Sequence, residues 1–342
     1  MWACPIFNFK KRNSTLTVML MGSLDCVVIG DIFIDIIVQV NENDLQFCRG
    51  GTSYCSFAGT AFGGGGNVAV GLSKIGGKSA FIGKAGEDFF GKSYVEDLKR
   101  NSVDAKVFLD KHLPTGLIVV FVEDNIQRSF LVFRGANDQL LSEEIERANN
   151  IIERSNYVYF SGFSLVSSVQ RNTILRAIDK AKKLRKKIVF DPGAFNLVKS
   201  QMRLFNNLLD VCDVFSPNLD EARAITNTSN IDDMVNKLQE RVPLTLLKCD
   251  QGGSILVSKN EVVKVPGNYV KCVDPTGAGD AFVAGALYGL SHELPLQSVG
   301  QLANWFSGEV VSKIGPRSYP KKSGIARFLE KLSGAYPNND HF

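Results

Sequence analysis

The sequence predicts an α/β protein, a sandwich in which helices pack on a mostly parallel sheet. From Ile145 onward, short apolar runs typical of buried strands alternate with longer segments of helical period. The chain has 342 residues, of which 44% are hydrophobic, so a large core is available. Polar residues follow several of the strands, at the edge of a parallel sheet where ligands bind.

Charge and residue usage disfavour several classes of function. Lys and Arg number 39 against 35 Asp and Glu, and the basic residues are scattered apart from 180–187, which is typical of a solvated helix, so no nucleic-acid partner is expected. The three histidines do not cluster, which disfavours a histidine metal site or a Ser-His-Asp triad. Seven cysteines without a CxxC pair indicate a reduced, cytoplasmic compartment. No apolar run approaches the roughly 18 residues of a spanning helix, so no membrane partner is expected.

The two ends of the chain are expected to lie outside the folded domain. Residues 1–23 are predicted to form a disordered extension, because their apolar stretch is short for a signal peptide and no cleavage site follows it. Translation from Met19 or Met21 is the alternative, and the sequence does not identify the true start. Residues 24–330 are expected to form the domain, and 331–342 a C-terminal tail.

The first predicted strand, 26–30, is apolar, and Asp31 to Val38 continue it. Acids within such a run are costly to bury unless they are paired or hydrogen-bonded. Asp35 could hold ligand hydroxyls, or it could cap local amides as a structural carboxylate.

The next segments predict a small separate sheet. Residues 39–60 are polar and rich in Ser, Gly and Thr, as in loops or an exposed sheet. Further along, 116–122 and 128–133 alternate as strands on either side of a short turn, which predicts a hairpin. Together, about 39–60 and 113–135 could form a lid that excludes water from a site.

A run of glycines lies between these segments. Gly63 to Gly66 precede Asn67 and a helix that is expected to stop at Gly76. A hinge is the ordinary role of such a run. Here Gly63 and Gly64 would let the backbone approach a ligand closely, and Asn67 offers both a donor and an acceptor, which favours a polyol-binding loop.

The remaining elements follow a strand and helix rhythm. In chain order they are strand 79–83, helix 87–100, strand 157–162, helix 169–184, strand 188–192, helix 200–210, strand 214–215, helix 221–225 and strand 245–248.

The most informative stretch is 274–280, a loop with Pro275 and two glycines that runs into an apolar helix. The backbone N–H groups of Gly277, Ala278 and Gly279 would face anions at the positive end of that helix. Asp280 would then be an ionised carboxylate able to accept a proton from a hydroxyl during phosphoryl transfer. The alternative is that Asp280 is only an N-cap.

These motifs resemble those of the PfkB carbohydrate kinase family, which has the ribokinase-like fold. Asp274 to Asp280 is similar to the family's D-T-x-G-A-G-D signature, Gly63 to Gly76 to its glycine motif, and 216–221 to its N-x-x-E element. The resemblance covers about residues 24–330, and three motifs in the right order make it specific. It implies a three-layer α/β/α sandwich with a small β-sheet lid, which in the family often makes homodimer contacts.

The resemblance also implies an activity and a set of site residues. It implies ATP-dependent phosphorylation of a sugar hydroxyl, fructokinase-like or ribokinase-like, with Mg²⁺ and in some members K⁺. Asp280 is then the general base, and the amides of Gly277, Ala278 and Gly279 form the anion hole. By the same carry-over the sugar contacts are Asp35, Gly63, Gly64 and Asn67, with Arg134 a candidate for the sugar or for a lid salt bridge; the nucleotide contacts are Asn218, Lys248, Gly253 and Asn304; the Mg²⁺ position is Glu221, through water; and Asp274 is a candidate monovalent-cation ligand.

Departures from the family pattern leave the acceptor open. Phe62 stands where the family has the first of its paired glycines, Pro275 replaces a threonine, and Asp250 stands at a position that is often glycine. A 2-keto-3-deoxygluconate kinase or a nucleoside kinase is the alternative, and a non-catalytic sugar-binding protein is a more remote one. A dinucleotide oxidoreductase and a P-loop kinase are disfavoured, because neither glycine motif is present.

Overall fold

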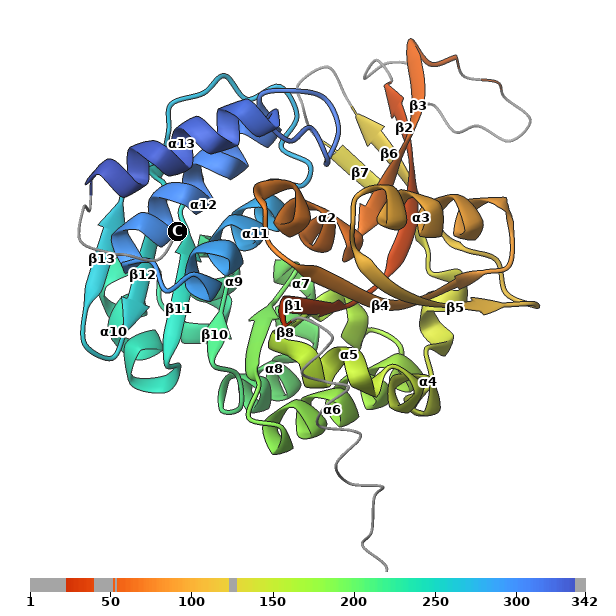
Figure 1. The fold of residues 1–342 in the computed structure, drawn as a ribbon, viewed down its shortest axis with the longest axis horizontal. Coiled ribbons are helices and arrows are strands. Elements are labelled where there is room, and N and C mark those ends of the chain that lie inside the picture. Colours follow the sequence, from red (N-terminus) through yellow and green to blue (C-terminus); the bar gives the residue numbers. More distant parts are fainter. Residues whose placement is uncertain (1–22, 40–51, 53, 123–127, 336–342) are drawn as a thin grey trace, which may run out of the picture.

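The structure is a computed structural model that describes residues 23–39, 52, 54–122 and 128–335. Figure 1 shows a large sheet between two layers of helices, with a small sheet standing at one side. The predicted three-layer α/β/α sandwich with a small sheet is therefore confirmed. The predicted extension up to residue 22, much of 39–60 and the end of the tail lie outside the described residues.

The large sheet has nine strands, and its centre is parallel. In spatial order the strands are β13 (Val262–Val265), β12 (Ser254–Ser258), β11 (Leu244–Lys248), β10 (Val214–Phe215), β9 (Lys187–Asp191), β8 (Ser155–Ser161), β1 (Leu24–Ile29), β4 (Ser79–Gly86) and β5 (Asp104–Asp110). The two antiparallel strands at one end of the sheet, β12 and the edge strand β13, were not predicted. The orientation of β12 follows from the short turn at η3 (Asp250–Gly252) and that of β13 from the short turn at 259–261, because connections of so few residues can only reverse the chain.

Helices cover both faces of this sheet and enclose two apolar cores. On one face pack α4 (Ser142–Arg147), α5 (Asn149–Arg154), α6 (Ser168–Lys183), α7 (Phe195–Ser200), α8 (Met202–Leu209), α9 (Leu219–Thr226) and α10 (Ile231–Arg241). On the other pack α2 (Gly66–Ile75), α3 (Phe89–Arg100), α11 (Ala278–Ser291), α12 (Leu296–Val311) and α13 (Lys322–Ala335). No helix in the described ranges is long and apolar enough to span a membrane.

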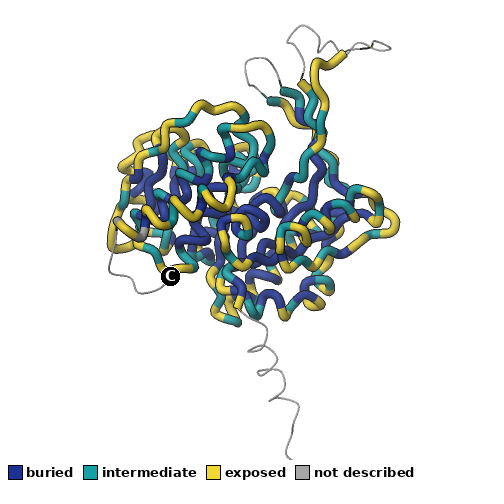
Figure 2. The backbone as a smooth tube through the Cα atoms, turned by 45° about the horizontal axis from the view of Figure 1, so that its top comes forward, coloured by how far each residue is buried: buried dark blue, intermediate teal, exposed yellow. Residues whose placement is uncertain are grey.

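The small sheet has the strand order β3-β2-β6-β7. Its strands are β2 (Ile32–Gln39), β3 (Phe57–Gly64), β6 (Gly116–Val122) and β7 (Arg128–Phe133). The predicted hairpin is confirmed, because β6 and β7 pair antiparallel. Figure 2 shows this sheet projecting from the body of the molecule, with exposed residues toward its tip.

The prediction that residues 31–38 continue the first strand is wrong. The chain leaves the large sheet after β1 and enters the small one as β2. The side chain of Asn137, in η1 (Gly135–Gln139), accepts a hydrogen bond from the N–H of Ile32 and donates one to its carbonyl, both at 2.8 Å. A distant side chain thus satisfies the backbone at the crossing, and no local pattern in the sequence reveals this.

Two helix ends bear on the predicted boundaries. Helix α2 stops at Gly76, whose φ of 112° suits glycine, as predicted. Helix α13 runs to Ala335, so the described structure continues past residue 330, where the domain was expected to end.

Candidate active site

The anion cradle forms where the loop after β13 enters helix α11. Gly277 has a φ of 78°, and a Cβ there would lie 2.5 Å from the carbonyl oxygen of Pro316, so only glycine fits. The N–H groups of Gly277 and Gly279 make no hydrogen bond within the described residues, whereas the N–H of Ala278 donates to the carbonyl of Pro275 at 3.3 Å. Two of the three predicted amides are therefore unpaired at the positive end of the helix.

Asp280 lies in the first turn of α11 and is half-buried. Its Oδ2 accepts a hydrogen bond of 2.9 Å from Nδ2 of Asn67, which stands 213 residues earlier in the chain. The N-cap position belongs to Gly277, so the structure does not support the capping alternative for Asp280. The pKa of Asp280 is raised to about 6, chiefly by burial and also by the charge of Asp191, while the Asn67 hydrogen bond and the charge of Lys248 oppose the rise.

Asp35, on β2, is a buried carboxylate that lacks a full set of partners. Its side chain is 6% exposed, and its Oδ1 has no hydrogen-bond partner. Burial raises the pKa of Asp35 to about 7; the charge of Asp280 raises it too, and that of Arg317 lowers it. Because an unsatisfied buried acceptor is costly, its persistence points to a ligand that donates hydrogen bonds.

The two predicted glycines of β3 give these groups room. A Cβ on Gly63 would lie 2.4 Å from Oδ1 of Asp35. Gly64 has a φ of 74°, and a Cβ there would lie 2.3 Å from the carbonyl oxygen of Asp31. Both positions require glycine, the first for space beside a carboxylate and the second also for conformation.

Arg134 belongs to a structural ion pair at the base of the small sheet. Its Nη2 donates to Asp31 at 3.1 Å and to Gln170 at 2.7 Å, and its Nε donates to Asp138. Most of its donors are engaged by protein groups, which favours the predicted lid salt bridge over the sugar contact.

Three predicted polar groups meet at the carboxyl ends of β9, β10 and β11. Lys248 Nζ lies 2.8 Å from Oδ2 of Asp191, and Asn218 pairs with Lys248 through a parallel bridge. Asn218 and Glu221 cap α9 reciprocally, each side chain accepting the other's backbone N–H at 2.8 Å. Glu221 is 2% exposed, and burial raises its pKa to about 7, with the charge of Lys248 opposing this and that of Asp191 adding to it.

Two predicted nucleotide contacts hold one backbone segment. Gly253 has a φ of 92°, and a Cβ there would lie 2.2 Å from the carbonyl oxygen of Val265. Asn304 Nδ2 donates to the carbonyls of Val265 and Pro266, both at 3.2 Å. Both residues therefore shape the segment after β13, and the Asn304 amide nitrogen is engaged with backbone.

Asp274 organises the loops around the cradle. Its Oδ1 accepts from the backbone N–H of Thr276 at 2.9 Å, and its Oδ2 accepts from the N–H of Gly315 at 2.8 Å. Arg128, on β7, lies 3.6 Å from Oδ1. Both oxygens are thus engaged by donors. No group of three His, Cys, Asp or Glu side chains that could hold a metal occurs in the described part of the chain.

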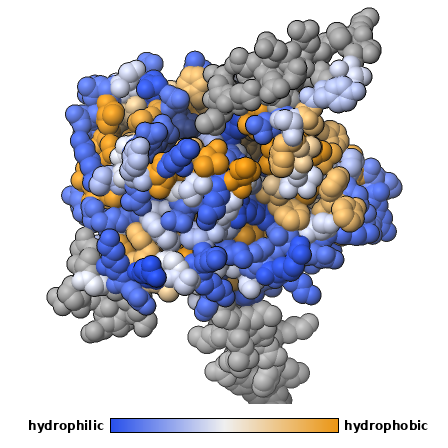
Figure 3. All heavy atoms as spheres, turned by 90° about the horizontal axis from the view of Figure 1, so that it is seen from above, coloured by the Kyte–Doolittle hydropathy of each residue, from blue (hydrophilic) through white to orange (hydrophobic). Residues whose placement is uncertain are grey.

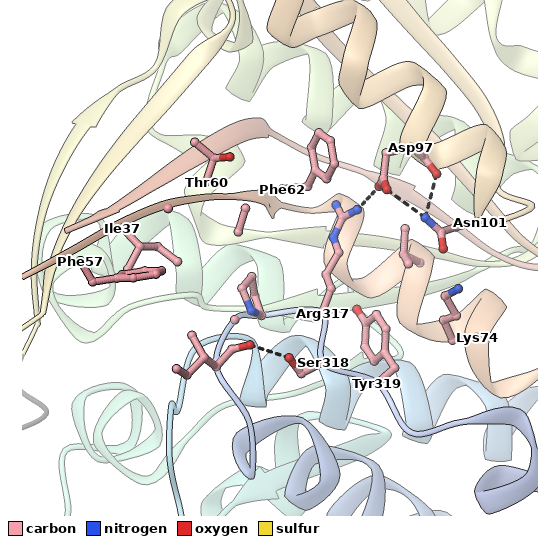
Figure 4. A pocket seen from close by; sticks show the side chains of 16 residues that line it. Ile37, Phe57, Thr60, Phe62, Lys74, Asp97, Asn101, Arg317, Ser318 and Tyr319 are labelled. Carbon is pink, nitrogen blue, oxygen red and sulfur yellow. Dashed lines mark hydrogen bonds and ion pairs between the residues drawn. The ribbon is translucent and has the colours of Figure 1, made fainter. Parts of the chain in front are cut away.

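Sequence reasoning missed Arg317, in the segment between α12 and α13. Its side chain reaches Asn67, Tyr94 and Asp97, and in Figure 4 it stands beside Phe62 in a pocket of about 460 Å³ between the small sheet and residues 314–319. No local motif marked it. The one available signal was Phe62, whose ring lies 5.4 Å from the guanidinium.

Comparisons with known proteins agree with this geometry. The sequence profile of pfkB family carbohydrate kinases matches residues 23–322. Probable fructokinase-7 of Arabidopsis thaliana is 33% identical over 239 residues, which are 67% of this chain and 70% of that protein.

Solved structures of kinases have the same fold. Adenosine kinase from Sinorhizobium meliloti superposes with a TM-score of 0.82 at 26% identity, covering 90% of this chain and 100% of that one. An uncharacterized sugar kinase from Pyrococcus horikoshii, solved in complex with ATP, superposes with a TM-score of 0.76 at 27% identity, covering 90% and 99%. The chain therefore belongs to the pfkB family and is a carbohydrate kinase.

Proposed function

We propose that this kinase transfers the terminal phosphoryl group of ATP to a sugar hydroxyl, with Asp280 as the general base. The observation that carries the proposal is the setting of Asp280. One of its oxygens is held by Asn67, the other makes no hydrogen bond within the described residues, and the unpaired N–H groups of Gly277 and Gly279 begin the same helix. This arrangement supports a proton acceptor beside an anion-stabilising site.

The chemistry follows from these positions. The acceptor hydroxyl gives its proton to Asp280 as its oxygen bonds to phosphorus and the bond to the ADP oxygen breaks. The amides of Gly277 and Gly279 stabilise charge on the transferred oxygens. With a pKa of about 6, Asp280 is mostly ionised at neutral pH yet basic enough to take the proton.

Asn218 and Glu221 are the residues that would hold Mg²⁺ with the ATP phosphates, Glu221 through water. Mg²⁺ prefers oxygen ligands, and Glu221 fits it best through its second carboxylate oxygen, because Asn218 Oδ1 and Glu221 Oε2 already accept backbone hydrogen bonds in the cap of α9. When bound, Mg²⁺ supplies charge neutralisation on the phosphates. Asp274 fits K⁺ poorly, since both of its oxygens already accept hydrogen bonds, and we assign that ion no role.

A polyol acceptor, as in a fructokinase or ribokinase, is favoured by the unpaired buried carboxylate of Asp35. Such a group accepts hydrogen bonds from hydroxyls held beside the backbone of Gly63. The likeness to probable fructokinases supports this acceptor. The likeness to an adenosine kinase keeps a nucleoside as the second candidate.

We further propose that the protein is a homodimer that pairs through the small sheet. Strand β7 is an edge strand with four consecutive exposed apolar residues, Phe130 to Phe133. In the view from above, apolar side chains gather on the side of the molecule that carries this sheet (Figure 3). Exposed apolar edge strands favour pairing with another chain.

The test of the activity is ADP release measured with a panel of sugars and nucleosides, for the wild type and Asp280→Asn. We expect turnover on at least one sugar and a loss of several orders of magnitude in Asp280→Asn with little change in sugar affinity. Near-normal turnover of the variant would refute the role of Asp280. Sugar binding without ADP release from the wild type would instead support a sugar-binding protein.

A further inference from the structure

The guanidinium of Arg317 is held rigidly beside the site. Its Nη1 donates to the carboxylate of Asp97 and its Nη2 to the hydroxyl of Tyr94 at 3.1 Å, both on α3. Phe62 and Tyr94 place their rings 5.4 and 5.3 Å from its central carbon. The side chain is 13% exposed. A planar cation with partners in several directions has little freedom to move.

The sequence around this cation is adapted to it. A Cβ on Gly66 would lie 2.1 Å from the hydroxyl of Tyr94 and 2.9 Å from Nη2 of Arg317. Phe62, the residue that departs from the family's glycine pair, packs edge-on against Tyr94 at 5.4 Å. Phe62 and Gly66 therefore both fit the positions of Tyr94 and Arg317.

The remaining contact joins Arg317 to the site. Its Nε donates to Oδ1 of Asn67 at 2.8 Å, and the hydroxyl of Tyr319 donates to the carbonyl of Asn67 at 2.7 Å. Because a guanidinium can only donate, the oxygen of the Asn67 amide must face Arg317. The amide nitrogen then faces Asp280 and donates to its Oδ2 at 2.9 Å. In the flipped orientation, an amide oxygen would face the carboxylate without a hydrogen atom between them.

We propose that Arg317 is a positioning residue for phosphoryl transfer, which fixes the amide of Asn67 so that Asp280 keeps one oxygen held and the other directed to the acceptor hydroxyl. The proposal rests on the role of Asp280 given above. Arg317 itself does not touch the reacting atoms. It acts through Asn67, and its charge helps to keep Asp280 ionised against the effect of burial.

Other charged and titratable groups also face Asp280, and a test must separate them from Arg317. They are Asp35 on β2, Tyr159 on β8, Asp191 on β9, Lys248 on β11 and Tyr319 beside α13. Within the described part of the chain, Tyr319 alone among these groups hydrogen-bonds to Asn67, and it reaches only the backbone carbonyl. A measurement that depends on the Asn67 side chain therefore separates the effect of Arg317, acting through Asn67, from the effects of these other groups.

The experiment is a double-mutant cycle of Arg317→Met and Asn67→Ala, with kcat and KM measured for the best acceptor. Arg317→Met is expected to lower kcat roughly 10- to 100-fold, the size of losing a hydrogen bond to a charged group, with KM for ATP unchanged. In the Asn67→Ala background the same change should lower kcat less than about 3-fold. Arg317→Lys should restore little of the lost kcat, because lysine lacks the planar, forked set of N–H donors of arginine. Fully additive losses would overturn the proposal.

Arg241→Met is the matched control, because Arg241 also ties two helices together but, within the described ranges, hydrogen-bonds to Asn206 and Asp210, neither of which is a site residue. Its kcat should equal that of the wild type. A readout without substrate separates this proposal from the activity. The side-chain ¹⁵N–¹H signals of Asn67 should shift with pH as Asp280 titrates, and Arg317→Met should reduce the size of that shift, because the amide is no longer held toward the carboxylate. If the wild type phosphorylates no acceptor yet Arg317→Met changes the Asn67 titration as expected, the proposed activity is wrong and the positioning role of Arg317 is supported. An unchanged Asn67 titration in Arg317→Met would overturn the positioning role.

Discussion

The carboxylate of Asp35 fills the space that a side chain on Gly63 would occupy, since a Cβ there would lie 2.4 and 2.6 Å from its two oxygens. The two residues lie on adjacent antiparallel strands of the small sheet, where β2 pairs with β3. The glycine and the acid are thus one feature, which the sequence displays as two separate ones.

Gly63→Ala is therefore expected to displace Asp35 and to raise KM for the acceptor by about 10-fold or more, because the new methyl group must share space with a carboxylate. Gly324→Ala is the control, because its nearest neighbour would be 4.0 Å from the new Cβ. Steady-state kinetics with the acceptor varied measures the effect. An unaltered KM in Gly63→Ala would contradict the assignment of Asp35 as an acceptor contact.

The pKa of Asp280, about 6, predicts an acid limb in the pH profile. The base must be ionised to take a proton, so kcat/KM should fall by at least about tenfold per pH unit below roughly pH 6, and Asp35, whose pKa is about 7, should add a shallower fall between pH 7 and 6. The measurement is kcat/KM from pH 4.5 to 8.5, with samples returned to pH 7.5 to confirm reversibility. A flat profile down to pH 4.5 would exclude Asp280 as the base.

Asp35→Asn should stabilise the protein at alkaline pH. The pKa of Asp35 is raised from 3.8 to about 7, so the folded state holds this proton more tightly than the unfolded chain does. Stability from this group is present below pH 4 and is lost as pH rises to about 7. The Tm of Asp35→Asn should exceed that of the wild type by roughly 2 to 6 °C at pH 8 and by much less at pH 4.5. A Tm difference independent of pH would contradict the raised pKa.

Glu221→Gln should increase the magnesium requirement. The amide oxygen of glutamine can still accept from the N–H of Asn218, so the cap on α9 is retained while the charge is lost. Asp220→Asn, one residue away with a side chain 66% exposed, should leave the requirement unchanged. Rates against free Mg²⁺ at saturating ATP measure both variants, and superimposable curves for Glu221→Gln and the wild type would argue against the metal role.

Leu131→Asp should convert the proposed dimer to a monomer, because Leu131 is 66% exposed at the centre of β7. Ile231→Asp makes the same change on α10, at a residue 41% exposed, and should leave the dimer intact. Sedimentation velocity at about 1 to 50 µM checks both. A wild type that is monomeric throughout this range would rule out the pairing.

The layers of the fold and much of the site could be predicted from local sequence. The alternation of apolar strand-like runs with helical segments predicts the parallel sheet, because the spacing of apolar residues within each element can be read from neighbouring residues alone. The glycines at 64 and 277 were recognisable because their positive φ angles require glycine, whereas the need for Gly63 comes from Asp35 on the neighbouring strand. The sequence also pointed to Asp280, through its place after a glycine loop at the start of an apolar helix.

The partners of these groups could be decided only by the tertiary structure. Asn67 meets Asp280 across 213 residues and Arg317 across 250. Asn137 sends β2 into the second sheet from 105 residues away. A hydrogen bond depends on distance and direction in space, and residues so far apart in the chain carry no shared period or spacing that would reveal them. Composition and order therefore determined the scaffold and its reactive carboxylate, whereas folding decided which cation and which amide hold that carboxylate in place.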